Sequence, residues 1–356
     1  MTLATFLKGK SVFLTGHTGF KGSWLCHVLK TFGAEVTGFS LPAAGKCHFL
    51  SCETETIVNH IVGDINSYTD LETAMVAADP DIVIHMAAQP LVRLSYERPL
   101  ETMQTNIMGT ANVLAAALKC DKKPVFACVT SDKCYENFEV ETPYKETDRI
   151  GGHDPYSASK GAAELVAASF AKSFYMKSNQ SILTLRGGNV VGGGDWSKDR
   201  IMTDIVSALS TDTSPIIRNP AAIRPWQHVL DVLQGYLLAI EQVAGLPSCC
   251  FEQFNIGPEP QNEASVGALA VMACSAWGGD ICPEICATEA ELHEAKLLRL
   301  DVSKAAEILN WRPKYGLSAT ISKTIEWYRA ESSGSSMSEF TEQQIVEYFY
   351  GEKISV

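Results

Sequence analysis

The sequence predicts an α/β fold in which helices cover both faces of a doubly wound parallel sheet. Short apolar runs alternate along the chain with helical segments of roughly ten or more residues, which is the pattern of βαβ units. A glycine-rich turn, TGHTGFKG (15–22), joins the first apolar run to the first helical segment. The 356 residues suffice for a large core in one or two closely joined domains.

The expected elements follow in regular order through the first half of the chain. SVFLT (11–15) predicts a first strand, and the segment 23–33 predicts a helix that ends at Gly33. Further strands are predicted at 34–40, 61–65, 81–88, 124–131 and 180–190, with helices at 69–79, 100–119 and 155–177. Such an order predicts a parallel sheet.

The character of the chain changes after residue 190. Loops rich in glycine, proline and arginine precede a helix at 229–244, and QFNIG (253–257) predicts a strand that returns to the main sheet. We therefore expect a nucleotide-binding domain at 1–188 and a smaller mixed α/β lobe at 189–330. The remainder, 331–356, has a linker composition followed by a peripheral helix or a frayed tail.

Composition excludes several classes of function. The net charge of −12 argues against non-specific binding to nucleic acid. No apolar stretch is long enough to span a membrane, and the N-terminus lacks the apolar block of a signal peptide, so we expect a cytoplasmic location. The eleven cysteines lack the paired spacings of zinc sites and are expected to be reduced thiols, with no bound metal.

The turn TGHTGFKG predicts a dinucleotide site. Gly16, Gly19 and Gly22 lie between a strand and a helix, where glycine permits a tight turn and close approach of a pyrophosphate. The start of the helix supplies backbone donors and a positive dipole. His17 and Phe20 belong to the same turn.

The expected cofactor is NAD, with NADP possible. An acidic residue about 20 positions after the turn is expected to hold the adenosine ribose. The corresponding stretch, GFSLPAAGK, has no carboxylate, and Lys46 is its one cation. The two cofactors therefore both stay open, and NAD is favoured.

Two later segments are candidates for the rest of the cofactor. Asp64 and Ile65 end the third expected strand, where Asp64 either faces the adenine or merely caps the strand. Ala87 and Ala88, in HMAAQ, offer small side chains against which a nicotinamide ribose could lie.

Tyr156 and Lys160 are the candidate acid–base pair. Four residues apart on a helix, they lie on one face, so the ammonium can approach the phenol. A nearby cation stabilises phenolate and is expected to draw the pKa of Tyr156 from ~10 toward neutrality. The pair could then accept a proton from a sugar or alcohol hydroxyl.

Several runs together resemble the extended short-chain dehydrogenase/reductase family. They are TGHTGFKGSW, HMAAQPLVRLSYERP, TNIMGT, TSDKCYEN, DPYSASKGAAELV, GGGDW and IRPWQHVL. Within that family they are similar to nucleotide-sugar 4,6-dehydratases, in particular those that act on CDP-glucose, and the likeness covers roughly residues 8–330. The resemblance implies a Rossmann fold and a C-terminal lobe that holds the nucleotide sugar.

The resemblance also implies roles for particular residues. Tyr156, with Lys160 and Ser131, would take the proton of the sugar O4 while hydride leaves C4 for the cofactor. Loss of the C5 proton and the C6 hydroxyl would then need a further base and acid. Asp132 and Lys133 follow Ser131 at the end of a strand, where such sheets bind ligands. Related dTDP-glucose dehydratases carry Asp-Glu at this point, whereas this chain has Asp-Lys.

Basic residues of the loops are candidates for substrate binding, because guanidinium groups suit phosphate oxygens. The resemblance makes Arg224 the best phosphate ligand, Asn189 a sugar or phosphate contact and Arg93 the sugar-side cation. It also matches His293 to a family segment near the nucleotide, although Lys296 and Leu297 depart from the usual His-Tyr. The full set of substrate candidates is Arg93, Asn189, Arg200, Arg218, Arg224 and His293.

Two rival functions remain open at the level of sequence. A nucleotide-sugar 4-epimerase would share Ser131, Tyr156 and Lys160 but has no use for the pair at 132–133. A non-catalytic sensor of NAD(P) would commonly lack the Tyr/Lys pair. Relatives typically form homodimers through the tyrosine-bearing helix and the helix near 100–119, and the apolar face AAELVAASFA fits such a dimer or packing on the sheet.

Overall fold

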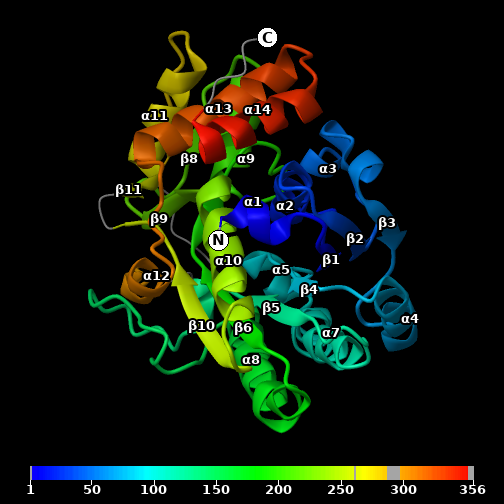
Figure 1. Ribbon diagram of the computed structural model, residues 1–356. Coiled ribbons are helices and arrows are strands. Elements are labelled where there is room, and N and C mark those ends of the chain that lie inside the picture. Colours follow the sequence, from blue (N-terminus) through cyan, green and yellow to red (C-terminus); the bar gives the residue numbers. More distant parts are fainter. Residues whose placement is uncertain (1, 260–261, 287–296, 352–356) are drawn as a thin grey trace.

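The computed structural model describes residues 2–259, 262–286 and 297–351. Its centre is a seven-stranded parallel sheet with the strand order β10-β6-β5-β4-β1-β2-β3 (Figure 1). The predicted fold class is therefore confirmed. The strands are β1 (Ser11–Thr15), β2 (Glu35–Ser40), β3 (Asn59–Val62), β4 (Ile82–His85), β5 (Val125–Val129), β6 (Ile182–Gly187) and β10 (Phe251–Ile256).

Helices cover both faces of this sheet, as the nearly continuous apolar strands require. One face carries α2 (Phe20–Thr31) and α10 (Val229–Ala244), and the other carries α4 (Tyr68–Ala78), α7 (Gly109–Ala117) and α8 (Pro155–Phe170). Each face has its own buried core. Trp24 and Leu233 belong to the first core, and Phe13 and Leu114 belong to the second.

The return of the chain to the sheet is also confirmed. β10 pairs in parallel with β6, so residues 251–256 extend the main sheet after the chain has built other elements. The strand order changes direction between β1 and β4, because β2 and β3 lie on one side of β1 and the later strands lie on the other. In open α/β sheets, this is where ligands bind, at the carboxyl ends of the strands.

Residues after 188 build small sheets and helices beside that edge. β7 (Asn189–Val191), β9 (Ile223–His228) and β11 (Glu263–Ser265) form one sheet, and β8 (Ile216–Ile217) pairs with β12 (Glu284–Ile285). Helices α9 (Ile201–Leu209), α11 (Val266–Trp277) and α12 (Ser303–Ile308) belong to the same part of the chain.

The segment expected to be a linker and tail is mostly helical. α13 (Leu317–Ser332) and α14 (Met337–Tyr350) leave only four residues between them, and α14 packs against α2 near the top of Figure 1. The rings of Phe32 and Phe349 lie 5.0 Å apart, and Ile345 is fully buried. Of the expected linker at 331–338, only residues 333–336 lie outside helices, because apolar residues on both flanking helices reach the core, and α14 agrees with the expected peripheral helix.

The remaining helices are short. They are α1 (Leu3–Leu7), α3 (His48–Ser51), α5 (Val92–Glu97) and α6 (Pro99–Met103). The helix predicted at 100–119 is interrupted by a wider π-helical turn at 104–108, between α6 and α7. Within the described part of the chain, no helix has both the length and the apolar character needed to cross a membrane.

Candidate functional site

The glycine-rich turn has the geometry that a bound pyrophosphate requires. Gly16 adopts a left-handed conformation (φ +78°), and a Cβ there would lie 2.6 Å from the backbone nitrogen of Ala87. A Cβ at Gly22 would lie 2.2 Å from the carbonyl oxygen of Gly16. Both positions therefore exclude any side chain, and the turn stays close to β4 and to its own helix.

The start of α2 is open to an anion. The N-cap is Gly19, which has no side chain to occupy the helix start, and the first turn has no acidic residue. Phe20, the first helical residue, packs toward Gly192, where a Cβ would lie 3.1 Å from its ring. The backbone donors and the positive end of the helix dipole at this 12-residue helix fit a dinucleotide phosphate.

His17 lies in a buried pair rather than facing solvent. Its Nε2 lies 2.6 Å from Nδ1 of His60 on β3, and its ring covers Gly38, where a Cβ would approach within 2.4 Å. Burial, reinforced by His60, lowers the pKa of His17 to about 4. His17 is therefore neutral at pH 7 and contributes shape to the turn, not charge.

The other cofactor candidates line the same edge of the sheet. Asp64 and Ile65 follow β3, which ends at Val62, earlier than predicted. The Asp64 carboxylate accepts from the backbone of Asn66, and the Ile65 side chain lies beneath Gly109. Ala87, directly after β4, contacts the glycine-rich turn, and Ala88 follows it.

Lys46 is already engaged by the C-terminal helices. Its ammonium lies 2.9 Å from the Glu331 carboxylate and 3.8 Å from the centre of the Trp196 ring. At the end of β2, the nearby polar groups are the hydroxyls of Thr18 and Ser40, which hydrogen bond at 2.8 Å.

Ser131, Asp132 and Lys133 form a tight 3-10 turn at the carboxyl end of β5. The Ser131 hydroxyl donates to Asp132 Oδ1 at 2.9 Å and accepts from the Lys133 backbone at 3.2 Å. Asp132 is only 5% exposed. Burial raises the pKa of its carboxyl group, although the charge of Lys133 and the hydrogen bond from Ser131 oppose this shift.

Tyr156 and Lys160 face this turn from α8. Asp154 caps the helix by accepting from the Ser157 backbone, and the two catalytic candidates are 8% and 7% exposed. Gly161 allows the close packing, since a Cβ there would lie 3.2 Å from the Cys134 carbonyl oxygen. The predicted spacing on one helical face thus places both side chains beside the end of β5.

The pKa of Tyr156 differs from the expectation. Burial raises it to about 12, while the Ser131 side chain and the charge of Arg200 act in the opposite direction. Burial also lowers the pKa of Lys160. Desolvation penalises the charged form of each side chain. In the protein alone, the pKa of the Tyr156 phenol is therefore not lowered toward 7.

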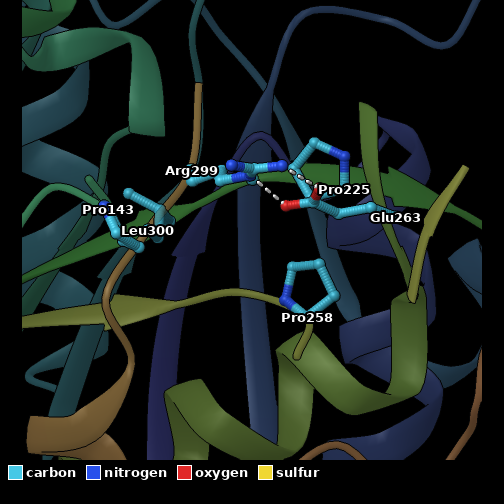
Figure 2. A pocket seen from close by; sticks show the side chains of 7 residues that line it. Pro143, Pro225, Pro258, Glu263, Arg299 and Leu300 are labelled. Atoms are coloured by element: carbon cyan, nitrogen blue, oxygen red, sulfur yellow. Dashed lines mark hydrogen bonds and ion pairs between the residues drawn. The ribbon is translucent and has the colours of Figure 1, made fainter. Parts of the chain in front are cut away.

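Four of the predicted residues line a single pocket. Asp132 and Lys133 meet Asn189 from β7 and Arg224 from β9, with Pro225 and Leu298 completing the wall. Pro225 also borders a second pocket, whose other lining residues are Pro143, Gly188, Pro258, Glu263, Arg299 and Leu300 (Figure 2). The two pockets therefore adjoin beside the end of β5.

The other substrate candidates have different surroundings. Arg200 lies near enough to Tyr156 for its charge to lower the phenol pKa. Arg93 instead forms an exposed ion pair with Asp199 at 3.2 Å, and Arg218 forms one with Asp204 at 3.8 Å. The position of His293 lies outside the described residues.

Three sets of residues at the site were not predicted from the sequence. Lys21, inside the glycine-rich turn, interacts electrostatically with Lys160. Thr130 donates to Glu164, which in turn pairs with Arg186, beneath the catalytic turn. Arg299 and Glu263 form a two-pronged ion pair with both N–O distances at 2.6 Å, visible in Figure 2. The lysine within a glycine motif was the one signal available in the sequence.

Known proteins are similar in sequence to this protein over most of its length. The sequence model of the GDP-mannose 4,6 dehydratase family matches residues 13–324. A CDP-glucose 4,6-dehydratase from Salmonella typhimurium is 40% identical over 349 residues, which are 96% of this chain and 97% of the relative. A dTDP-glucose 4,6-dehydratase from Streptomyces antibioticus is 28% identical over 274 residues, 76% of each chain.

The solved structures agree in fold. A UDP-glucose 4-epimerase from Thermus thermophilus, in complex with NAD, superposes with a TM-score of 0.76 and 22% identity, over 90% of this chain and 99% of that one. At this identity, the likeness concerns the fold alone. The match to the family over most of the sequence, with the 40% identity, shows that the chain belongs to the nucleotide-sugar 4,6-dehydratases, the GDP-mannose 4,6 dehydratase family.

Proposed function

We propose that this enzyme converts CDP-glucose to CDP-4-keto-6-deoxyglucose with NAD as its cofactor. The observation that carries the proposal is the pocket in which Asp132 and Lys133 meet Asn189 and Arg224 beside the catalytic tyrosine. An epimerase needs no acid and base at that place. The 40% identity to the Salmonella CDP-glucose enzyme over nearly the full length of both chains supports cytosine as the base.

The cofactor would lie across the glycine-rich turn and the ends of β3 and β4. Gly16, Gly19 and Gly22 would accommodate the diphosphate, Asp64 and Ile65 the adenosine side, and Ala87 and Ala88 the nicotinamide ribose. The chemistry that NAD supplies when bound is hydride transfer from the sugar and back to it. NAD fits better than NADP, because a 2′-phosphate would have to draw Lys46 away from both its ion pair with Glu331 and its contact with the Trp196 ring.

Tyr156 would take the O4 proton as the sugar is oxidised at C4. The phenolate that accepts this proton needs positive charge around it, since its pKa in the protein alone is about 12. Lys160 and Arg200 provide fixed cations, and the charge of the oxidised cofactor adds to them. Ser131 would orient the same oxygen through its hydroxyl.

Asp132 and Lys133 would then carry out the elimination. For this step the proton shared by the two side chains would lie on Asp132, which leaves Lys133 neutral. The 4-ketone acidifies the C5 proton, which would pass to the neutral Lys133, and the C6 hydroxyl would leave as water with the proton from Asp132. Burial raises the pKa of Asp132, which suits a group that must hold a proton until this step. After hydride returns to C6, Lys133 returns the proton to C5, and the 4-keto-6-deoxy product forms.

The substrate diphosphate would bind between Arg224, Asn189 and Arg200. Arg93 and Arg218 could join only after leaving their exposed acidic partners, which cost little to separate. This assigns cofactor binding to residues 1–188 with β10, and substrate binding mainly to 189–330. A homodimer through α8 and the α6–α7 segment is part of the proposal, supported by the exposed Leu100 and Leu165.

The test is incubation of the purified protein with NAD and a panel of CDP-, dTDP-, UDP- and GDP-glucose, with the product mass measured. The expected result is that CDP-glucose is the preferred substrate and loses about 18 mass units, the mass of one water molecule. A product of unchanged mass that chromatography identifies as CDP-galactose would instead identify a 4-epimerase. Dehydration of another nucleotide sugar alone would retain the reaction and overturn the choice of base.

A further inference from the structure

Lys21 places a positive charge where the glycine-rich turn meets the catalytic residues. It is the second residue of α2, and its ammonium lies 5.7 Å from the centre of the Tyr236 ring on α10. Four charged side chains from other segments interact with it electrostatically: Lys160, Arg200, Asp132 and Asp195.

Few neighbouring groups neutralise the positive charge of the Lys21 ammonium. Within the described part of the chain, Lys21 makes the ring contact with Tyr236 but no hydrogen bond or ion pair. The Tyr236 hydroxyl is likewise buried without a hydrogen-bond partner among the described residues. Burial, followed by repulsion from Lys160 and Arg200, lowers the pKa of Lys21 to about 8. A partly buried cation without a direct ion-pair partner is costly, and Asp132 and Asp195 offset this cost only in part, so the arrangement favours an added anion.

The balance of charge at this point agrees. Lys160 and Arg200 repel Lys21 while Asp132 and Asp195 attract it, and burial favours the neutral, protonated form of Asp132, in a protein whose net charge is −12. The first turn of α2 adds backbone donors and carries no acidic side chain. A local positive excess beside a glycine-rich turn is suited to a phosphate.

We propose that Lys21 is a phosphate ligand for the dinucleotide, and that its ammonium donates to a diphosphate oxygen in addition to the backbone donors of the turn. The inference rests on the proposed use of NAD. Because Lys21 repels Lys160, a phosphate that neutralises Lys21 also stabilises the protonated form of Lys160. Binding of the cofactor and preparation of the Tyr156–Lys160 pair are thereby coupled.

The test compares Lys21→Met with the wild type and with Lys30→Met, an exposed position at the far end of the same helix. Affinities for NADH, ADP-ribose and AMP are measured by titration calorimetry at low and high salt, after circular dichroism has verified folding. If Lys21→Met does not fold, Lys21→Gln takes its place.

Lys21→Met should weaken NADH and ADP-ribose about ten- to a hundredfold, the worth of one charge-assisted hydrogen bond, and change AMP much less. It should also reduce the salt dependence of ADP-ribose binding. Wild-type affinity for ADP-ribose in Lys21→Met, or weaker binding with an unchanged salt dependence, would overturn the role of Lys21. Failure of the wild-type protein to bind NADH and ADP-ribose would instead overturn the proposed cofactor.

Discussion

Removal of one atom, the phenol oxygen of Tyr156, separates proton transfer from the binding of cofactor. Tyr156→Phe removes the acid–base group and keeps the ring that fills the buried site. We expect turnover of CDP-glucose to fall by about 10²–10⁴-fold, the usual contribution of general acid–base catalysis. NADH affinity, measured by fluorescence titration, should stay close to that of the wild type.

The matched control for this variant is Tyr350→Phe, at a half-exposed position of α14 far from the catalytic turn. It should retain full turnover. Activity in Tyr156→Phe close to that of this control would contradict the assignment of the proton relay.

Lys133 separates the second half of the reaction from the first. Lys133→Ala removes the proposed C5 base and leaves Tyr156, Lys160 and Ser131 in place. Oxidation at C4 should therefore proceed while elimination slows at least tenfold, so that reduced cofactor accumulates. Absorbance at about 340 nm in a single-turnover experiment measures it.

Lys177→Ala, at an exposed position beyond α8, is the control and should show no such accumulation. Equal slowing of cofactor reduction and product formation in Lys133→Ala would assign this lysine to substrate binding instead.

At the level of elements, α8 is held to the sheet by a buried ion pair below Tyr156 and Lys160. Glu164 and Arg186 are 2% and 0% exposed, and their Oε2 and Nη2 atoms lie 2.8 Å apart. Thr130 also donates to Glu164, which ties the pair to the residue before Ser131. Glu164→Ala leaves a buried guanidinium without its partner, so the free energy of unfolding should fall by about 3–5 kcal/mol in urea titrations.

An exposed ion pair provides the comparison. Arg98 and Glu101 are more than half exposed and lie 3.3 Å apart, so Glu101→Ala should cost about 0–1 kcal/mol. A loss below about 1 kcal/mol in Glu164→Ala would show that α8 is fixed by apolar packing rather than by this pair.

The sequence could predict those elements whose local pattern matches their surroundings. The helix predicted near 229–244 agrees with α10 (Val229–Ala244), because apolar residues recur along it at helical spacing, and β10 was found within two residues. β7 was merged with β6, since Gly187 and Gly188 give no sign that the chain changes sheet. The polar run ESSGSSMS hid the end of α13 and the start of α14 for a similar reason.

The residues of the candidate site likewise fall into those that the local sequence reveals and those that only the fold reveals. Gly16, Gly22, Tyr156 and Lys160 are recognisable because their spacing along the chain is itself the chemical requirement. Ion pairing is different, since it depends on which segments meet in space. Residue type alone does not separate Arg93 and Arg218 from Arg224, which only the resemblance made the best phosphate ligand. The fold gives Arg93 and Arg218 exposed acidic partners and places Arg224 in the pocket.

At the scale of the whole molecule, the C-terminal helix is joined to the core through a buried carboxyl group. Asp231, on α10, accepts from the Tyr348 hydroxyl of α14 at 2.6 Å and from the Lys314 backbone at 2.7 Å. Its second oxygen has no hydrogen-bond partner within the described residues. Burial raises its pKa to about 6, against the hydrogen bonds from Tyr348 and the backbone.

This shift predicts a pH dependence of stability with a definite sign. Because the folded pKa lies above the unfolded value of ~3.9, the stabilising contribution of Asp231 is fully present below about pH 4 and is lost as the pH rises through about 6. The shift of roughly 2 units corresponds to about 3 kcal/mol.

Asp231→Asn keeps an acceptor for Tyr348 and Lys314 but cannot ionise. Its free energy of unfolding, relative to the wild type, should therefore rise by about 2 kcal/mol between about pH 4.5 and pH 8 in urea titrations. Asp280→Asn, at an exposed position, should show no comparable trend. A constant difference between Asp231→Asn and the wild type over this range would mean that Asp231 is ionised at all these pH values. The junction between α10 and α14 would then be stabilised by the charged carboxylate, and acid rather than base would loosen the C-terminal helix.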